Sequence, residues 1–400
     1  MSAIKTITLT LVLAVLALSE SGFSQDAPQY IARKDIKLKN GAVIQAGDLI
    51  NGVPDGKNVV IDMPGQQVAV SLKDLANMNE AVDVLTNLIR KHPKEAHYYS
   101  ARANVWAIRN DLAKAIEDAS QAIAVSEQED SMTFVNRGAF YSSARDYDRA
   151  VADYIKATHL NPQNYTAYTS LAAAHISRKE YDKAVKVCTS VINVDGKNPA
   201  HYVQRGVAHR FLEDWDAAIA DFTTALEHNK NDLAALGSRG FVNYLKGDHA
   251  AAVKDFDIIV KLKPNDAMAY NNRGYNRQLS GDFKNALVDY DKAVQLLPTY
   301  AVAWQNKAWL LATCSDESVR NGQEAVIAAK KACDQRETKV AGDLKALAAA
   351  YAEVGDFENA VKYQSNVIDL AALDAEESEK EILQLYRDKK PYRSEAVSEK

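Results

Sequence analysis

Residues 267–300 read AMAYNNRGYNRQLSGDFKNALVDYDKAVQLLPTY, and this stretch decides the fold because the chain repeats its pattern every 34 residues. The eighth position is small, at Gly138, Ala172, Gly206, Gly240 and Gly274. The sixteenth is acidic, at Asp146, Glu180, Asp214, Asp248 and Asp282. The twentieth is Ala, at Ala150, Ala184, Ala218, Ala252 and Ala286. The twenty-fourth is an aromatic residue or Cys, at Tyr154, Cys188, Phe222, Phe256 and Tyr290. A fixed period of this length is typical of a solenoid.

Each recurring residue has a physical role in a helical hairpin. Small residues at the eighth and twentieth positions let two helices approach closely, and the large residue at the twenty-fourth fills the space beside them. The acidic residue precedes the second helix, where it can accept free N–H groups and where its charge favours the helix dipole. Proline ends several units, at Pro162, Pro264 and Pro298. One hairpin buries too little surface to stand alone, so the hairpins are expected to stack.

The quoted stretch resembles a standard tetratricopeptide repeat (TPR), through Tyr270 to Tyr275, Gly281 to Phe283 and Ala286 to Tyr290. Full repeats are predicted at 96–129, 131–164, 165–198, 199–232, 233–266 and 267–300. Another, 301–335, carries an insertion around Ser315 to Gly322; an eighth covers 341–372, and a half repeat begins near Ala81. The resemblance implies a mainly α fold, a right-handed superhelical TPR solenoid of about eight repeats plus a half repeat, over residues 76–372.

The segments on either side of the array have different patterns. Residues 28–74 alternate apolar and polar residues between turn signals such as Asn40-Gly41 and Pro64-Gly65, which predicts five short strands. Their spacing resembles a small all-β SH3-like barrel. Residues 373–400 are predicted to be a capping helix, at 374–388, and a tail.

The first 24 residues have the pattern of a signal peptide. Lys5 precedes the uncharged apolar run Ile7 to Leu18, which is too short to span a bilayer. Cleavage is expected before Gln25, or alternatively after Ser19, and an uncleaved membrane anchor is the other interpretation. The mature protein is therefore expected to be exported, periplasmic or extracellular, without stable membrane insertion.

The composition and motifs argue against catalysis and against nucleic acid as a partner. The formal net charge is -5 and the pI about 6.0, so there is no general attraction for polyanions. We find no Walker loop, no G-x-G-x-x-G, no G-x-S-x-G and no H-E-x-x-H, and the histidines are not paired at helical metal-site spacing. We therefore expect a protein that is not an enzyme and has no cofactor.

A second recurring pair concerns stability. Where the seventh position is Arg, the twenty-third is Asp: Arg102 with Asp118, Arg137 with Asp153, Arg205 with Asp221, Arg239 with Asp255, and Arg273 with Asp289. Where the seventh is Leu171 or Leu347, the twenty-third is Val187 or Tyr363. Because both partners change together, the pattern predicts an ion pair between the two helices of a hairpin.

The resemblance implies that the first helices of the repeats line a concave groove that binds a protein or peptide of unknown identity. The predicted groove residues are polar at the sixth position, namely Asn136, Ser170, Gln204, Ser238, Asn272 and Asn306. They are joined by the aromatic residues Phe241, Tyr244, Tyr275 and Trp309. The alternatives are an array that is only a spacer, with these rings already buried, or an accessory subunit of an envelope enzyme or cell-wall complex recruited through the SH3-like module. Residues 28–74 could equally cap the array.

Export is testable with a fusion. Residues 1–30 joined to a reporter that is active only outside the cytoplasm should direct export, because the short apolar run fits a cleavable signal. N-terminal sequencing should find processing near Gln25. An intact N-terminus on a reporter retained in the cytoplasm would refute the prediction.

Overall fold

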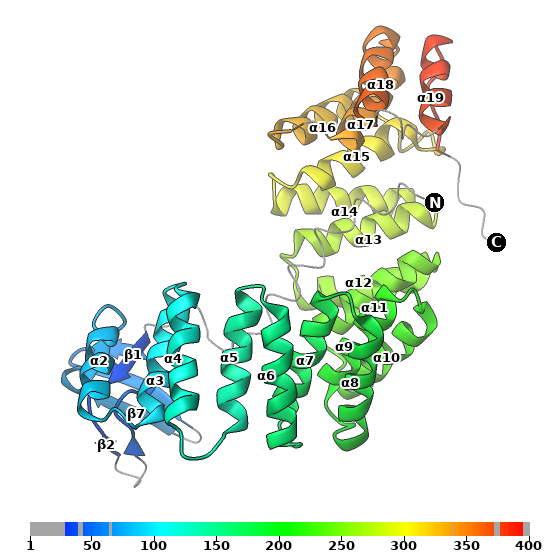
Figure 1. Cartoon of the computed structure of the whole chain (residues 1–400). Helices are drawn as coiled ribbons and strands as arrows, with labels where there is room; N and C mark the ends of the chain where they lie inside the picture. The colour runs from blue at the N-terminus through cyan, green and yellow to red at the C-terminus, as the bar shows by residue number, and fades with distance from the viewer. Residues whose placement is uncertain (1–28, 39–42, 64–65, 339, 372–376, 395–400) are drawn as a thin grey trace. The chain divides into compact units, whose positions relative to one another are not determined.

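The computed structural model describes residues 29–38, 43–63, 66–338, 340–371 and 377–394. The predicted signal peptide, residues 1–24, lies outside them. The chain divides into two compact units, Met1–Leu212 and Glu213–Lys400. We describe each unit by itself (Figure 1).

Short antiparallel strands open the first unit. They are β1 (Gln29–Ala32), β2 (Ile36–Lys37), β3 (Val43–Ile44), β4 (Leu49–Asn51), β5 (Val53–Asp55), β6 (Asn58–Met63), β7 (Gln66–Ser71) and β8 (Leu75–Asn77). They pair as β4-β1-β8, β2-β3 and β5-β6-β7. The all-β character of this segment was predicted, but the described strands form three separate sheets and do not close into a barrel. In hairpins of such short strands, the turns determine the register and the pairing. The alternation of apolar residues does not specify these turns.

Helices form the rest of the first unit. They are α2 (Ala81–Lys91), α3 (Ala96–Ile108), α4 (Leu112–Val125), α5 (Ser131–Ser143), α6 (Tyr147–Leu160), α7 (Tyr165–Ser177), α8 (Tyr181–Val194) and α9 (Pro199–Phe211). Figure 1 shows the strands beside α2 and α3, with the following helices stacked in sequence order. Helix α2 is the predicted half repeat.

The second unit continues the series. Its helices are α10 (Trp215–His228), α11 (Leu233–Lys246), α12 (His249–Leu262), α13 (Ala267–Leu279), α14 (Phe283–Leu296), α15 (Ala301–Thr313), α16 (Gly322–Asp334), α17 (Ala341–Glu353), α18 (Phe357–Ala371) and α19 (Glu377–Arg387). The first helices of the repeats start where the period predicted. The insertion forms the long connection between α15 and α16, and α19 is the predicted capping helix.

Close helix approach explains the small residues. A Cβ on Gly274 would lie 3.0 Å from the Asp289 Cβ and 3.1 Å from the Tyr290 ring. Ala286 and Tyr290 are fully buried on the facing helix. Any larger side chain at position 274 would push the two helices apart, so the eighth position is restricted by packing.

The turn between the two helices of a repeat uses a left-handed residue. Positive φ angles occur there at Asn110, Arg145, Lys179, Glu213, Gly247, Gly281 and Gly355. After α11, Gly247 N–H donates to the Tyr244 carbonyl and Asp248 N–H to the Asn243 carbonyl, which is a Schellman motif. Asp248 then caps α12 by accepting from the Ala251 N–H. The predicted acidic cap is confirmed at most of these positions, although Glu180 and Asp282 make no such bond.

Substitutions at this turn should change stability in opposite directions. Gly281→Ala should lower the free energy of unfolding by about 1 kcal/mol, because an L-residue is strained at φ 82° while its Cβ meets no atom within 4 Å. Lys179→Gly should stabilise, since Lys179 already has φ 61°. Urea unfolding followed by circular dichroism measures both. Equal destabilisation by the two changes would contradict this explanation.

Half-buried arginines pair with aspartates on the second helix of the same hairpin, as predicted. Bidentate pairs join Arg102 to Asp118, Arg137 to Asp153, Arg239 to Asp255 and Arg273 to Asp289, at 2.6–3.1 Å. The four Asp residues are 1–5% exposed. The bond to Asp118 raises the pKa of Arg102 above its ordinary value. The fifth pair, Arg205 with Asp221, falls on two different units and stays a prediction.

Each guanidinium also contacts the preceding repeat, which the sequence reasoning missed. The Nη1 atoms donate to hydroxyl or carboxylate groups of the preceding second helix, namely Thr86, Ser120, Thr189, Thr223 and Asp257. Lys307 occupies the same position in the next repeat and binds Asp291 and Glu324, both at 2.6 Å. The sequence signal for this contact is a hydroxyl or carboxylate residue at the twenty-fifth position of the preceding repeat. The cation at position seven therefore links its own repeat to the one before it.

Removing one partner of such a pair should cost more than removing both. Arg239→Leu leaves Asp255, which is 2% exposed, without its counter-ion, so a loss of about 3–5 kcal/mol is expected. Arg239→Leu with Asp255→Val should be less damaging, because it recreates the apolar pair of the third repeat. Urea unfolding of both single variants and the double variant gives the coupling energy. Additive effects would show that the two side chains do not act as a pair.

Candidate functional site

In the first unit, the predicted groove residues lie on three first helices. Asn136, Ser170 and Gln204 are all half-buried, on α5, α7 and α9. The Gln204 Nε2 donates to the Thr169 carbonyl at 3.1 Å, across to the preceding first helix. The Gln204 Oε1 is buried without a hydrogen-bond partner. This side chain therefore links two repeats, and its donor is already used.

The second unit has a related chain of side-chain amides. The Asn306 Nδ2 donates to Asn271 Oδ1 at 2.9 Å, and the Asn271 Nδ2 donates to Asn272 Oδ1 at 3.4 Å. Asn271 is 3% exposed, so it is a buried connector between α13 and α15. We call Asn271, Asn272 and Asn306 the amide chain. Within the described residues, the Asn272 Nδ2 and the Asn306 Oδ1 make no bond to protein. Ser238 lies half-buried on α11 and makes no hydrogen bond to a described residue.

Three of the predicted aromatic residues form one cluster. The Tyr244 ring lies 6.0 Å from Phe241 and 5.7 Å from Tyr275, the latter edge-on. All three are half-buried. Burial, with Tyr244 as a further cause, raises the pKa of Tyr275 well above its usual range, so this phenol stays neutral. We call these residues the aromatic cluster. It lies on α11 and α13, the latter of which also carries Asn272.

Trp309 is separate from the cluster. Its ring lies 5.7 Å from the Tyr392 ring, and the Lys345 ammonium lies 5.2 Å from its centre. Tyr392 belongs to the C-terminal tail after α19. The structure thus brings Phe241, Tyr244 and Tyr275 together and places Trp309 under the chain's own tail.

A further asparagine, Asn276, supports the amide chain, and the sequence pattern did not predict it. Asn276 is 3% exposed; its Nδ2 donates to the Asn272 carbonyl at 2.9 Å, and its Oδ1 lies 3.2 Å from His249 Nδ1. Because Asn276 bonds to the Asn272 backbone, it fixes the helix turn that presents the Asn272 amide. The only sequence signal was the high asparagine content of the first helix at 267–279.

Family comparisons agree with this geometry. Two sequence models, each described as a tetratricopeptide repeat, match residues 69–130 and 203–267, and residues 142–204. The first helices begin at about the same spacing through these matches and beyond them as far as α15. The chain is a TPR protein. Proteins of this kind typically mediate protein–protein interactions. A search of curated protein sequences finds no significant match.

Several solved TPR structures are similar to the chain. One from Parabacteroides merdae is 17% identical, covers 64% of this chain and 98% of its own, and has a TM-score of 0.48. The C-terminal part of a TPR protein from Cytophaga hutchinsonii is 16% identical over 57% of this chain and 94% of its own, with a TM-score of 0.48. YrrB, described as a TPR protein with an unusual peptide-binding site, is 25% identical over 48% and 98%, with a TM-score of 0.40.

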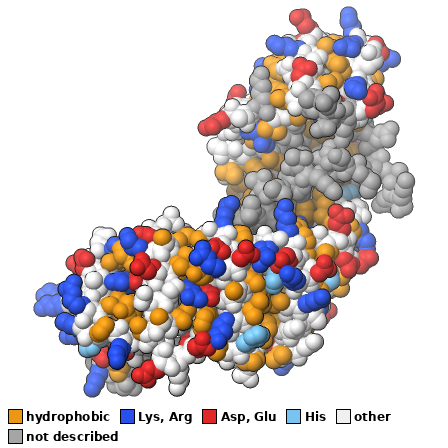
Figure 2. All heavy atoms as spheres, viewed as in Figure 1, with side chains coloured by type: hydrophobic (Ala, Val, Ile, Leu, Met, Phe, Trp, Pro, Cys, Tyr) orange, Lys and Arg blue, Asp and Glu red, His pale blue; other side chains and the backbone are white. Residues whose placement is uncertain are grey.

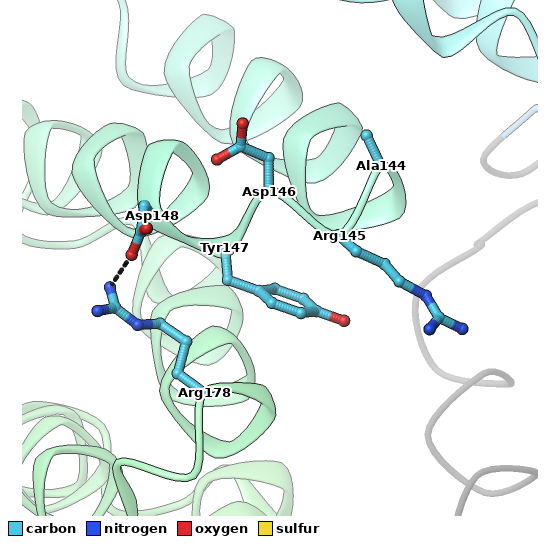
Figure 3. A pocket seen from close by; sticks show the side chains of 6 residues that line it. All are labelled: Ala144, Arg145, Asp146, Tyr147, Asp148 and Arg178. Carbon is cyan, nitrogen blue, oxygen red and sulfur yellow. Dashed lines mark ion pairs between the residues drawn. The ribbon is translucent and has the colours of Figure 1, made fainter.

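Two surface hollows have none of the predicted TPR groove residues in their linings. One, of about 440 Å³, is lined by Ala144, Arg145, Asp146, Tyr147, Asp148 and Arg178. Figure 3 shows it open beside the turn between α5 and α6, with Arg178 paired to Asp148 at 2.9 Å. A second, of about 470 Å³, lies in the other unit and is lined by Tyr270, Arg273, Val288, Asp289, Asp291, Lys292 and Gln295. Its Arg273 and Asp289 are already paired to each other, so these two charges serve the fold.

The described residues show no metal centre, because no group of three His, Cys, Asp or Glu side chains among them could hold an ion. In this same part of the chain no helix is long and apolar enough to cross a bilayer. Acidic and basic side chains are interspersed on the face of the first unit that Figure 2 shows.

Proposed function

We propose that the protein is a non-catalytic scaffold that binds an extended peptide on the first helices α11, α13 and α15. The observation that carries the proposal is the amide chain. The Asn306 amide donates to Asn271 of the preceding repeat, and the Asn272 oxygen accepts from Asn271 on its own helix, which leaves a donor, Asn272 Nδ2, and an acceptor, Asn306 Oδ1.

This pair of groups suits a peptide backbone. An extended backbone presents alternating N–H and C=O groups, so a donor and an acceptor on successive repeats can bind it with little demand on sequence. The buried bonds to Asn271 hold both amides in place before binding, which lowers the entropy lost on association. The aromatic cluster beside Asn272 supplies apolar surface for a side chain of the peptide.

We propose that the strand-containing segment caps the array. Ile31 of β1 and Ala76 of β8 share a buried core with Ala81 and Leu85 of α2 and with Val105 of α3. A Cβ on Gly47 would approach Leu85 and Tyr98 within 3.3 Å, so the turn before β4 lies directly on these helices. A folded cover of this kind protects the terminal repeat from solvent. No contact favours the SH3-like recruiter or an envelope enzyme subunit over this role.

We also propose that the scaffold acts outside the cytoplasm, in the periplasm or beyond the cell. The support is the apolar run Ile7 to Leu18 after Lys5. The partner of the scaffold should therefore be another exported protein.

The groove is tested by removing one donor without disturbing the amide chain. Asn272→Asp keeps the oxygen that accepts from Asn271 and replaces the free Nδ2 with an acceptor; Tyr275→Ala removes a ring of the aromatic cluster. The partner is first identified by affinity purification of the mature protein from envelope extracts. Calorimetry with that partner should show the double variant binding at least about tenfold more weakly, since a lost hydrogen bond and lost apolar contact together exceed ~1.4 kcal/mol.

The matched control is Asn265→Asp, which adds the same charge at an exposed residue of the loop before α13. It should bind with unchanged affinity. If the double variant is folded by circular dichroism and binds as tightly as the control, the groove site is elsewhere or the array is only a spacer.

A further inference from the structure

The C-terminal tail reverses direction after α19. Lys389 has φ 56°; its N–H donates to the Tyr386 carbonyl, and the Lys390 N–H donates to Leu385 at 2.8 Å. This is the Schellman ending of a helix, and Pro391 follows it, as proline often does. The turn sends the segment Tyr392, Arg393 and Ser394 back to α15 and α17. We call these three residues the tail segment.

The tail segment binds the last backbone carbonyls of α15. The Ser394 N–H donates to the Thr313 carbonyl at 2.9 Å, and the Arg393 Nη1 donates to the Ala312 carbonyl at 3.3 Å. The last carbonyls of a helix have no partner within the helix and carry its partial negative charge. The Ser394 N–H group and the Arg393 guanidinium therefore supply hydrogen bonds to these carbonyls, and the guanidinium also supplies a positive charge.

Two side chains of the tail segment have partners of their own. Arg393 pairs with Glu353 at 2.6 Å, and Glu353 is 13% exposed. The Tyr392 ring lies against Trp309 and packs at the edge of the core formed by Ala348, Ala352 and Tyr386. One aromatic contact, one ion pair and one backbone bond thus fall on successive residues, which is how a groove recognises a short linear motif.

We infer that Trp309, Glu353 and the last carbonyls of α15 form a docking site for an extended peptide with an aromatic residue followed directly by arginine. The tail segment is its intramolecular occupant. The site deepens the proposed function, on which it rests because Trp309 belongs to the predicted groove residues. A tethered occupant has a millimolar effective concentration, so a partner with this motif binds well only after the tail segment leaves.

The occupant is a small part of the second unit. Of its side chains, Tyr392 and Arg393 contact the site and Ser394 contributes mainly polar bonds to Thr313. The α19 helix has its own anchors on the array, since Ile382, Leu383 and Tyr386 are 0–8% exposed. The tail segment can therefore be exchanged without loss of the capping helix.

The test supplies the motif in trans. A fluorescent peptide with the sequence of residues 388–394, DKKPYRS, is titrated against the full chain and against the full-length variant Tyr392→Ala with Arg393→Ala. Fluorescence anisotropy should show saturable binding to the variant at least about tenfold tighter than to the unaltered chain, because the variant leaves the site open. A peptide with Ala in place of its Tyr and Arg should not bind. Glu353→Gln added to the variant should weaken binding.

Either of two results would overturn the inference: no binding to a folded variant, or equal binding to the variant and the unaltered chain. If the double variant does not fold, Arg393→Ala alone removes the pair with Glu353 and keeps Tyr392 on its core, so the peptide should bind this variant more tightly than the unaltered chain, by a smaller factor. The proposed function fails separately. If the peptide binds at Trp309 but the partner binds the Asn272→Asp variant with unchanged affinity, the groove is refuted and the tail site is not. If the partner binds that variant more weakly but the peptide does not bind, only the tail site is refuted.

Discussion

A guanidinium held between three helices is the interaction on which the array depends. Arg273 binds Asp289 on its own second helix and Asp257 on the preceding one, and it is 13% exposed. A planar, permanently charged group can bind two carboxylates at once, which lysine does less well. In the equivalent pair of Arg239 with Asp255, loss of the guanidinium leaves a carboxylate that is 2% exposed without its counter-ion, so the hairpins keep a fixed spacing. The third repeat shows the other solution, with Leu171 buried in its place.

The arginine contacts lie on the side of the first helices that faces the second helices. The opposite side of the first helices therefore carries other kinds of contact. There the contacts between successive repeats are weaker and neutral: amide to amide in the second unit, amide to carbonyl at Gln204. These amides keep unused donors and acceptors, whereas the guanidinium charges of the four bidentate pairs are already neutralised by carboxylates. Charge thus stabilises the array, and neutral polar groups remain for a partner.

The sequence predicts the parts of this structure that depend on a period. Small residues, caps and Arg–Asp pairs lie at fixed offsets within one hairpin, so each could be deduced from the repeat alone. The pairing of the strands could not, because segments of two to six residues take their register from their turns. The bond between Asn306 and Asn271 could not be predicted from the sequence either, because it depends on how one repeat stacks on the next. Trp309 shows the same limit, because the ring that covers it comes from a tail outside the repeat pattern.

In the proposed groove, a partner peptide lies along the first helices of the second unit. Site-specific photo-cross-linking tests it most directly, with a photoreactive amino acid placed either at Tyr275 in the aromatic cluster or at Val288, which is 62% exposed on the second helix α14. Illumination with the bound partner should give an adduct from position 275 and none from position 288. Adducts from position 288 alone would contradict it.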